Sequence, residues 1–213
     1  MAKTDDTPVA ARVRNSVGNV TFAQCRGSSV AKKKVNSNSS NTLPQRKQRL
    51  RMKAMLPLEE MIESGAEKGL KNRPADQDVH NAAISANLNE EVIQVSDDLV
   101  VTVNYEKVVC AKGRRMLPRT FSVTADAENK TLTFKHSTEA RGRNRDKDDK
   151  FYALVLMPEL KDSELYELDT RTNEEPVSIT LPQEWDMDSI KVYVFALSKD
   201  GKIASDSRYL TVG

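Results

Sequence analysis

The sequence predicts an α+β protein in which an N-terminal basic arm, a hairpin and short helices precede a C-terminal immunoglobulin/fibronectin-III-like antiparallel β-sandwich. Three observations carry this prediction. Basic residues crowd the first third of the 213-residue chain, apolar residues recur at helical spacing after Thr42, and apolar and polar residues alternate from Leu99 onward. We therefore expect three segments: residues 1–56 with the basic arm, hairpin and first helix, residues 57–96 as a helical connector, and residues 97–213 as the sandwich.

The first third of the chain contains the signals of one hairpin. Apolar and polar residues alternate from Val20, and Gly27-Ser28-Ser29 supplies a turn. We expect Asn19–Arg26 to pair with Ser29–Val35, after a flexible tail over residues 1–15. An isolated hairpin is marginal in water, so we expect it to dock on its own body or on another subunit.

Helical signals follow the hairpin. Thr42 is suited to cap a helix over Pro44–Met55, because Pro is favoured in the first helical turn. Pro57 either interrupts this helix or begins a second one, which ends at Gly69. A third helix is expected over Asp76–Asn87, where apolar residues return at helical spacing.

The remainder of the chain predicts short strands separated by turns, the pattern of an antiparallel sandwich. We expect Trp185, Tyr193 and Phe195 in its core. The expected strands are Leu99–Val103, Lys107–Ala111, Thr120–Ala125, Lys130–Lys135, Phe151–Met157, Ser163–Asp169, Pro176–Leu181, Ile190–Leu197 and Ser207–Val212.

The formal net charge of +2 hides a strong asymmetry along the chain. Residues 1–75 hold 15 Lys+Arg against 6 Asp+Glu, and the remaining residues hold 18 against 25. From Arg12 to Lys53 there are 11 basic residues and no acidic one. Such an arm predicts an acidic partner, which is nucleic acid or the acidic half of a neighbouring copy; the alternative is an arm whose charges are simply solvated. The candidate partner- or nucleic-acid-binding residues are Arg26, Lys32, Lys33, Lys34, Arg46, Lys47, Arg49, Arg51 and Lys53.

Composition argues against several classes of protein. No apolar run approaches the roughly 20 residues that cross a bilayer, and no apolar segment follows Met1, so we expect neither a membrane partner nor a secretory signal and place synthesis in the cytoplasm. Cys25 and Cys110 lie far apart in dissimilar contexts and predict no disulfide framework or metal cluster. No Gly-rich phosphate loop occurs.

The candidate chemical groups also favour a non-enzymatic protein. His80 and His136 have no catalytic or metal-binding motif around them. Asp146 to Asp149 lacks the Gly and the later Glu of a calcium loop, so we expect a solvated hairpin tip over Glu139–Lys150. We therefore expect no catalytic residue, no metal, no cofactor and no small-molecule substrate. An acidic helical face, expected to be solvated or to complement the basic arm, is formed by Glu59, Glu60, Glu63 and Glu67.

Several weak motifs occur in a fixed order along residues 18–213. In this order the chain resembles an uncharacterised family of Bacteroidetes proteins classed as a domain of unknown function, although Leu43-Pro44 stands where that family has Thr-Pro. The resemblance implies no established activity, and it implies a phage-derived structural protein with an arm and a sandwich. The motifs are Gly18-Asn19-Val20, Lys32-Lys33-Lys34, Asn41 to Arg49, Asn81-Ala82-Ala83, Val103 to Val108, Leu181 to Trp185, Val192 to Phe195 and Ser198 to Gly201.

We accordingly expect a non-enzymatic structural subunit of a symmetric assembly. The favoured form is a phage virion component, of the capsid or of the head–tail connector or collar, which docks through its basic N-terminal arm to other copies of itself or to other subunits. The alternative is a nucleic-acid-binding protein that uses the arm on phosphates. A carbohydrate-binding or adhesive sandwich is a third class, which the lone Trp185 disfavours.

Overall fold

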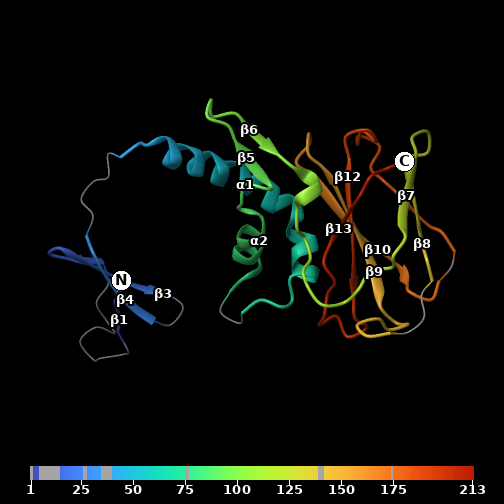
Figure 1. Ribbon diagram of the computed structural model, residues 1–213, viewed down its shortest axis with the longest axis horizontal. Coiled ribbons are helices and arrows are strands. Elements are labelled where there is room, and N and C mark those ends of the chain that lie inside the picture. Colours follow the sequence, from blue (N-terminus) through green and yellow to red (C-terminus); the bar gives the residue numbers. More distant parts are fainter. Residues whose placement is uncertain are drawn as a thin grey trace. The chain divides into compact units, whose positions relative to one another are not determined.

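The computed structural model describes residues 2–4, 15–25, 28–34, 40–74, 77–138, 142–173 and 175–213 (Figure 1). The chain divides into two compact units, Met1–Thr42 and Leu43–Gly213. The expected segment boundary at residues 56 and 57 falls inside a helix of the second unit.

The N-terminal unit is a four-stranded antiparallel sheet in the order β1-β4-β3-β2. Its strands are β1 (Ala2–Thr4), β2 (Asn15–Val17), β3 (Val20–Cys25) and β4 (Ser28–Lys33). The pairing of β3 with β4 confirms the expected hairpin. The tail expected over residues 1–15 is wrong at Ala2–Thr4 and at Asn15, which belong to strands that pair with β4 and β3. Those two strands occupy the hairpin edges, whose backbone groups would otherwise lack partners.

The second unit begins with a long helix, α1 (Leu43–Gly69). The expected break at Pro57 is wrong, because the helix continues through the proline. Figure 1 shows a bend partway along α1, which we attribute to Pro57 because a proline inside a helix kinks it. Met55 and Leu58, on either side of the proline, are both buried, so packing holds the two halves in one helix. The expected end at Gly69 is confirmed.

The close contact between the end of α1 and Ala111 explains why residue 69 is a glycine. A Cβ added at this position would lie 2.4 Å from Ala111 Cβ and 2.6 Å from Ala111 Cα. Only glycine therefore allows the end of α1 to lie so close to the neighbouring chain segment.

The second helix is α2 (Val79–Asn87), which confirms the expected third helical segment. Asp78 caps it by accepting a hydrogen bond of 2.7 Å from Asn81 N. At its other end, the Asn87 side chain accepts from Val109 N at 2.7 Å and donates to Val109 O at 2.8 Å.

The expected strand over Lys107–Ala111 is wrong, and these hydrogen bonds help to explain why. Tyr105–Lys107 form a 3-10 turn, and the following residues are not in a strand. Asn87 from α2 and the Tyr193 hydroxyl, which donates to Tyr105 O at 2.6 Å, bond this backbone in place of a strand ladder. The remaining eight expected strands of the second unit are present.

The described strands of this unit form three antiparallel sheets, in the orders β10-β9-β12-β13, β11-β8-β7 and β5-β6. The first and third hold β5 (Ile93–Val95), β6 (Val101–Val103), β9 (Lys150–Met157), β10 (Asp162–Thr170), β12 (Lys191–Leu197) and β13 (Arg208–Leu210). The second holds β7 (Phe121–Asp126), β8 (Thr131–His136) and β11 (Val177–Thr180).

The four-stranded sheet is covered on both faces. On one face, Tyr152, Leu154 and Phe195 share a core with α1 and α2. On the other face, Phe151 and Val194 share a second core with the three-stranded sheet. Two-sided burial explains why β9 and β12 are almost continuously apolar, whereas a half-exposed strand alternates.

The expected core residues are confirmed, since Trp185, Tyr193 and Phe195 are at most 1% exposed. Two antiparallel sheets thus pack face to face in an α+β protein with a β-rich C-terminal part. Along the chain, β10 is the fourth strand of the two packed sheets, after β7, β8 and β9, and it lies in the same sheet as β9. In a constant-type immunoglobulin domain, the fourth strand lies instead in the sheet that holds the first two strands. The finer immunoglobulin/fibronectin-III-like assignment stays a prediction. No described helix is long and apolar enough to cross a membrane.

Candidate partner-binding surfaces

The nine predicted binding residues fall on both units. Lys32, Lys33 and Lys34 are exposed at the end of β4. Five others, Arg46, Lys47, Arg49, Arg51 and Lys53, lie on α1 in the second unit. Arg26 lies outside the described residues. The prediction therefore covers two separate surfaces, one on each unit.

The N-terminal sheet has an apolar face, which comprises Val17, Val20, Phe22 and Ala31. Val17 pairs with Val20 across β2 and β3, and Phe22 pairs with Ala31 across β3 and β4. Directly opposed residues of antiparallel strands share a face, as do residues two apart along a strand. Val17 is 60% exposed and Val20 is 36% exposed, and the other two are half-buried. Among the described residues, buried apolar side chains begin only at Met55.

Two of the predicted α1 residues are engaged within the chain. Lys47 Nζ donates to Asp97 Oδ1 at 2.5 Å, and Arg51 Nη2 donates to Glu90 Oε1 at 2.9 Å while its Nε donates to Ile93 O at 3.1 Å. The hydrogen bond and the charge of Lys47 hold the pKa of Asp97 below its usual value. Lys47 and Arg51 therefore fix the β5-β6 hairpin to α1.

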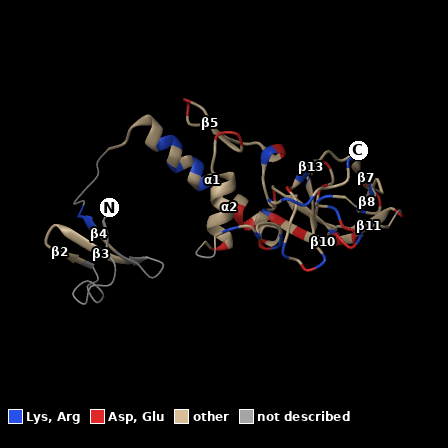
Figure 2. Cartoon of the chain, turned by 60° about the horizontal axis from the view of Figure 1, so that its bottom comes forward, with Lys and Arg blue, Asp and Glu red and all other residues tan. Residues whose placement is uncertain are grey.

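The other three predicted α1 residues, Arg46, Arg49 and Lys53, are exposed. Figure 2 shows the basic bands along the amino-terminal half of the helix. Spacings of three and four residues place all three on one helical face. Their exposed side chains give the second unit a basic surface of its own.

The predicted acidic face of α1 divides into two parts. Glu59 is only 3% exposed and its Oε1 lies 2.8 Å from His80 Nδ1 on α2, so it belongs to a helix–helix contact. Glu60, Glu63 and Glu67 are exposed. The helix turns Glu59 toward α2, which the spacing of the carboxylates alone did not reveal.

A buried ionic cluster around Asp149 was missed by the sequence prediction. The expected solvated tip is wrong at this residue, because Asp149 is fully buried. Its Oδ2 lies 3.3 Å from Arg171 Nη2 and its Oδ1 lies 3.4 Å from Arg115 Nη1. Arg171, itself 2% exposed, also lies over the Phe151 ring at 5.3 Å. The cluster joins three distant chain segments, so we assign it to stability.

The described residues offer little to acid–base or thiol chemistry. Burial raises the pKa of the Cys110 thiol to about 12, so this thiol stays protonated and unreactive near neutral pH. His136 packs against the rings of Phe121 and Phe151. Among the described residues, no group of three or more His, Cys, Asp or Glu side chains is arranged to hold a metal ion.

Two surface cavities are each lined in part by the segment 112–115. One, of about 540 Å³, is lined by residues that include Leu70, Arg73 and Lys112. The other, of about 620 Å³, is lined mainly by charged residues that include Arg115 and Lys199. Neither is lined by any of the nine predicted binding residues, so the candidate surfaces remain the N-terminal sheet and α1.

These features define an α+β protein with a small basic N-terminal sheet and a body of two face-to-face antiparallel sheets backed by helices. The chain belongs to a family of unknown function, DUF6266, whose model matches residues 12–211. The predicted membership in a family of unknown function is thereby confirmed. Neither the search of curated proteins nor that of solved structures found a match.

Proposed function

We propose that this chain is a non-enzymatic structural subunit of a larger assembly, and that its N-terminal sheet docks on a neighbouring copy or subunit. The observation that supports this role is the partly exposed apolar face of that sheet. Val17 is 60% exposed and Val20 is 36% exposed, and they sit beside Phe22 and Ala31 on one face. A small sheet needs a packed face for stability, and contiguous exposed apolar residues mark interaction sites.

Charge favours the same kind of partner. Lys33 pairs with Val20 and so lies on the same face as the apolar residues, while Lys32 lies on the opposite face. The part of the chain from residue 76 onward holds more acidic than basic residues. A basic sheet and an acidic body are electrostatically complementary between copies, which raises the rate of association. A phage virion component remains the assembly we favour, on the resemblance set out above.

A deletion tests whether the N-terminal unit is needed for assembly. The cut belongs after Thr42, where the compact units divide, because a cut after residue 56 would remove half of α1. Both buried cores lie within residues 43–213, so we expect this shorter chain to fold. At about 0.5 M salt, where exposed charges are screened, the full chain is expected to sediment as an oligomer and the shorter chain with a smaller mass.

A pair of matched full-chain variants makes the test specific to the apolar face. Val17→Asp with Phe22→Asp places two charges on that face and is expected to reduce the sedimenting mass as the deletion does. Ser16→Asp with Ala23→Asp places the same charges, at the same diagonal spacing, on the opposite face, and is expected to leave the mass unchanged. An unchanged mass for the first pair, or an equal loss for both, would overturn the proposal.

The nucleic-acid alternative is favoured by one observation, the exposure of Lys32, Lys33 and Lys34. Replacing all three by Gln is then expected to abolish retention of DNA at low salt, because each lost phosphate contact removes counterion release. Replacing Lys107, Lys135 and Lys161 by Gln gives the matched control. DNA retention that is absent in the native chain, or equal in both variants, would exclude this alternative.

A further inference from the structure

A continuous stripe of exposed side chains runs along α1 on the side away from its packed contacts. Residues that alternate in spacing between three and four lie on one helical face. Leu56, at the centre, is 45% exposed, and its neighbour Met52 is 39% exposed. We call this face the α1 stripe, and its seven exposed members are Arg46, Arg49, Lys53, Leu56, Glu60, Glu63 and Glu67.

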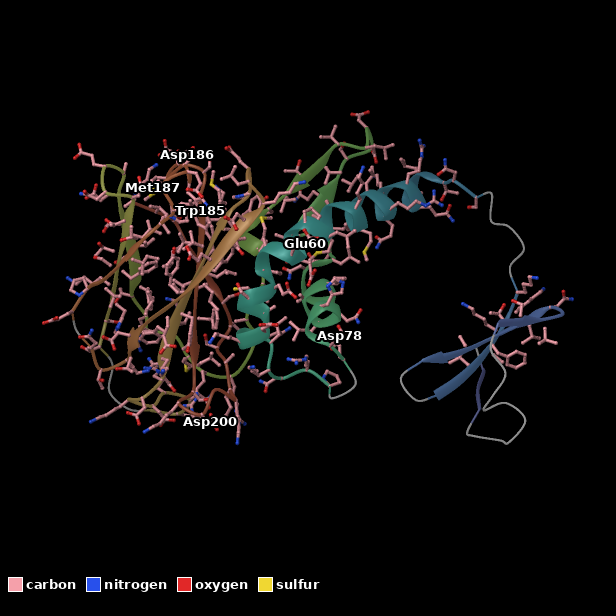
Figure 3. All side chains as sticks on the ribbon, turned by 180° about the vertical axis from the view of Figure 1, so that it is seen from behind. Glu60, Asp78, Trp185, Asp186, Met187 and Asp200 are labelled. Atoms are coloured by element: carbon pink, nitrogen blue, oxygen red, sulfur yellow. The ribbon has the colours of Figure 1, made fainter. Side chains whose placement is uncertain are left out.

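Charge is sorted along the α1 stripe. The three residues before Leu56 are basic and the three after it are acidic, with Glu60 at the middle of the helix (Figure 3). Arg49 and Lys53 are four apart, as are Glu63 and Glu67, and like charges at this spacing destabilise a helix by a few tenths of a kcal/mol. Basic residues toward the N-terminus and acidic ones toward the C-terminus also oppose the helix dipole. Helix stability alone therefore does not account for this pattern.

The pattern is instead complementary to itself in the antiparallel direction. If Leu56 of one copy faces Leu56 of another, Lys53 meets Glu60, Arg49 meets Glu63 and Arg46 meets Glu67, each within about one residue of register. We propose that the α1 stripe docks on the α1 stripe of a second copy, antiparallel, about a two-fold axis at Leu56. This contact uses a surface other than the N-terminal sheet and so does not depend on the function proposed above.

The contacts that α1 makes within the second unit lie away from the α1 stripe. Lys47 and Arg51, which hold the β5-β6 hairpin, lie on the opposite side of the helix, at about 100° per residue. The buried residues Ile62 and Ala66 also point away from the stripe and into the first core. No described ion pair involves Lys53, Glu60 or Glu63.

The bend at Pro57 is compatible with this arrangement. Pro57 lies about a quarter turn around the helix from the centre of the α1 stripe, so the helix bends sideways relative to the stripe. A two-fold axis that bisects the bend exchanges the two halves of the helix. The basic half of each copy then still lies on the acidic half of the other.

The size of the contact predicts its strength. From Arg46 to Glu67 the helix is about 30 Å long, and a contact about 10 Å wide would bury roughly 300 Å² per copy. A stable interface buries about 800 Å² per partner. We therefore expect a weak dimer that forms at low salt and dissociates as salt shortens the screening length from about 10 Å to about 3 Å.

Charge reversal followed by mixing tests the contact, first in the full chain and then in residues 43–213. The acidic variant carries Arg46→Glu, Arg49→Glu and Lys53→Glu, so its whole stripe is negative. The basic variant carries Glu60→Lys, Glu63→Lys and Glu67→Lys, so its whole stripe is positive. A control with the same charge change as the acidic variant, but away from α1, carries Lys107→Glu, Lys135→Glu and Lys161→Glu.

Sedimentation at about 0.05 M salt is expected to show a dimer for the chain of residues 43–213 and for the control, with the dissociation constant raised at least about tenfold in each reversed variant. An equimolar mixture of the two reversed variants is expected to restore the dimer, because every pair across the axis is then attractive. Circular dichroism verifies that each variant is folded. Mild oxidation of the Leu56→Cys variant is expected to form a disulfide between two copies at the axis. The Lys71→Cys variant, whose cysteine lies outside the stripe, is not expected to form one.

The outcomes separate this inference from the function proposed above. No association of the native chain at low salt, or a mixture that remains monomeric, would overturn the two-fold contact. A stripe that instead binds DNA through its basic half, or the N-terminal sheet of its own chain, would overturn it as well. Loss of assembly on deleting residues 1–42 tests only the function proposed for the N-terminal sheet, because the shorter chain keeps the whole α1 stripe.

Discussion

Replacing Asp149 by Ala tests the assignment of the buried ionic cluster to stability. The carboxylate is fully buried and lies 3.3 Å from Arg171 Nη2 and 3.4 Å from Arg115 Nη1. It also accepts a 3.0 Å hydrogen bond from Asp146 N. The substitution would leave the Arg171 guanidinium, only 1% exposed, without its buried counter-charge.

The expected magnitude follows from that burial. Removing one partner of a buried ion pair costs about 3–5 kcal/mol of unfolding free energy, because the remaining charge is desolvated without compensation. For a unit of this size, that loss corresponds to a melting temperature lower by about 6–20 °C. Asp148 gives the control, since it pairs with Lys199 at 3.0 Å but is 61% exposed, and Asp148→Ala is expected to cost less than about 1 kcal/mol.

Urea unfolding followed by fluorescence measures both variants, because the chain holds a single tryptophan and Trp185 is buried. We expect the midpoint to fall sharply for Asp149→Ala, with an unchanged dependence on urea concentration. Adding Arg171→Met to that variant is expected to recover part of the loss, since an apolar side chain then replaces the unpaired charge. Equal midpoints for the Asp149 and Asp148 variants would refute the reasoning.

Three further outcomes are expected from the same body. Gly69→Ala should cost about 1–3 kcal/mol of unfolding free energy in a melting experiment, because its Cβ would lie 2.4 Å from Ala111 Cβ, and an unchanged melt would contradict that packing. Burial raises the pKa of the Cys110 thiol to about 12, so this thiol should resist a thiol reagent at pH 8 until the chain unfolds. Peptide mass mapping would measure the labelling, and immediate labelling of the folded chain would disprove the burial. The hydrogen bond from Lys150 lowers the pKa of Glu167, so the stability that this carboxylate adds is present above about pH 4.5 and is lost as pH falls through the lower pKa of the folded state. The difference in stability from Glu167→Gln, under about 1 kcal/mol, should therefore shrink as the solution is acidified, and a constant difference would argue against this role.

Local signals predicted most elements of this fold. The alternation from Leu99 and the spacing after Thr42 depend on neighbouring residues, and the structure confirms eight of nine expected strands in the body. The failures lie where distant residues decide the local structure. Asn87 bonds the backbone at Val109, which removes a strand that alternation alone predicts.

The candidate surface could be predicted only in part, because distant residues also decide which of its side chains are exposed. Composition located the basic residues of α1, but it could not separate Lys47 and Arg51, which meet acidic residues 50 and 39 positions away, from those left exposed. The same limit applies to Glu59, whose partner on α2 decides its burial. A helical projection of residues 46–67 would have shown the sorted charges of the α1 stripe, provided that Pro57 is taken to bend the helix and not to end it.

The two proposed contacts differ in what each can build. A two-fold contact of the α1 stripe is satisfied by two copies, because each stripe then faces another. An N-terminal sheet that docks on a different surface of the next copy is not self-limiting, and it closes only as a ring or a shell. An assembly larger than a dimer therefore needs the sheet, and the stripe would set the symmetry of its building block. If both proposals hold, deleting residues 1–42 leaves a salt-sensitive dimer, whereas reversing the charges of the stripe leaves an oligomer that lacks the two-fold contact and resists salt.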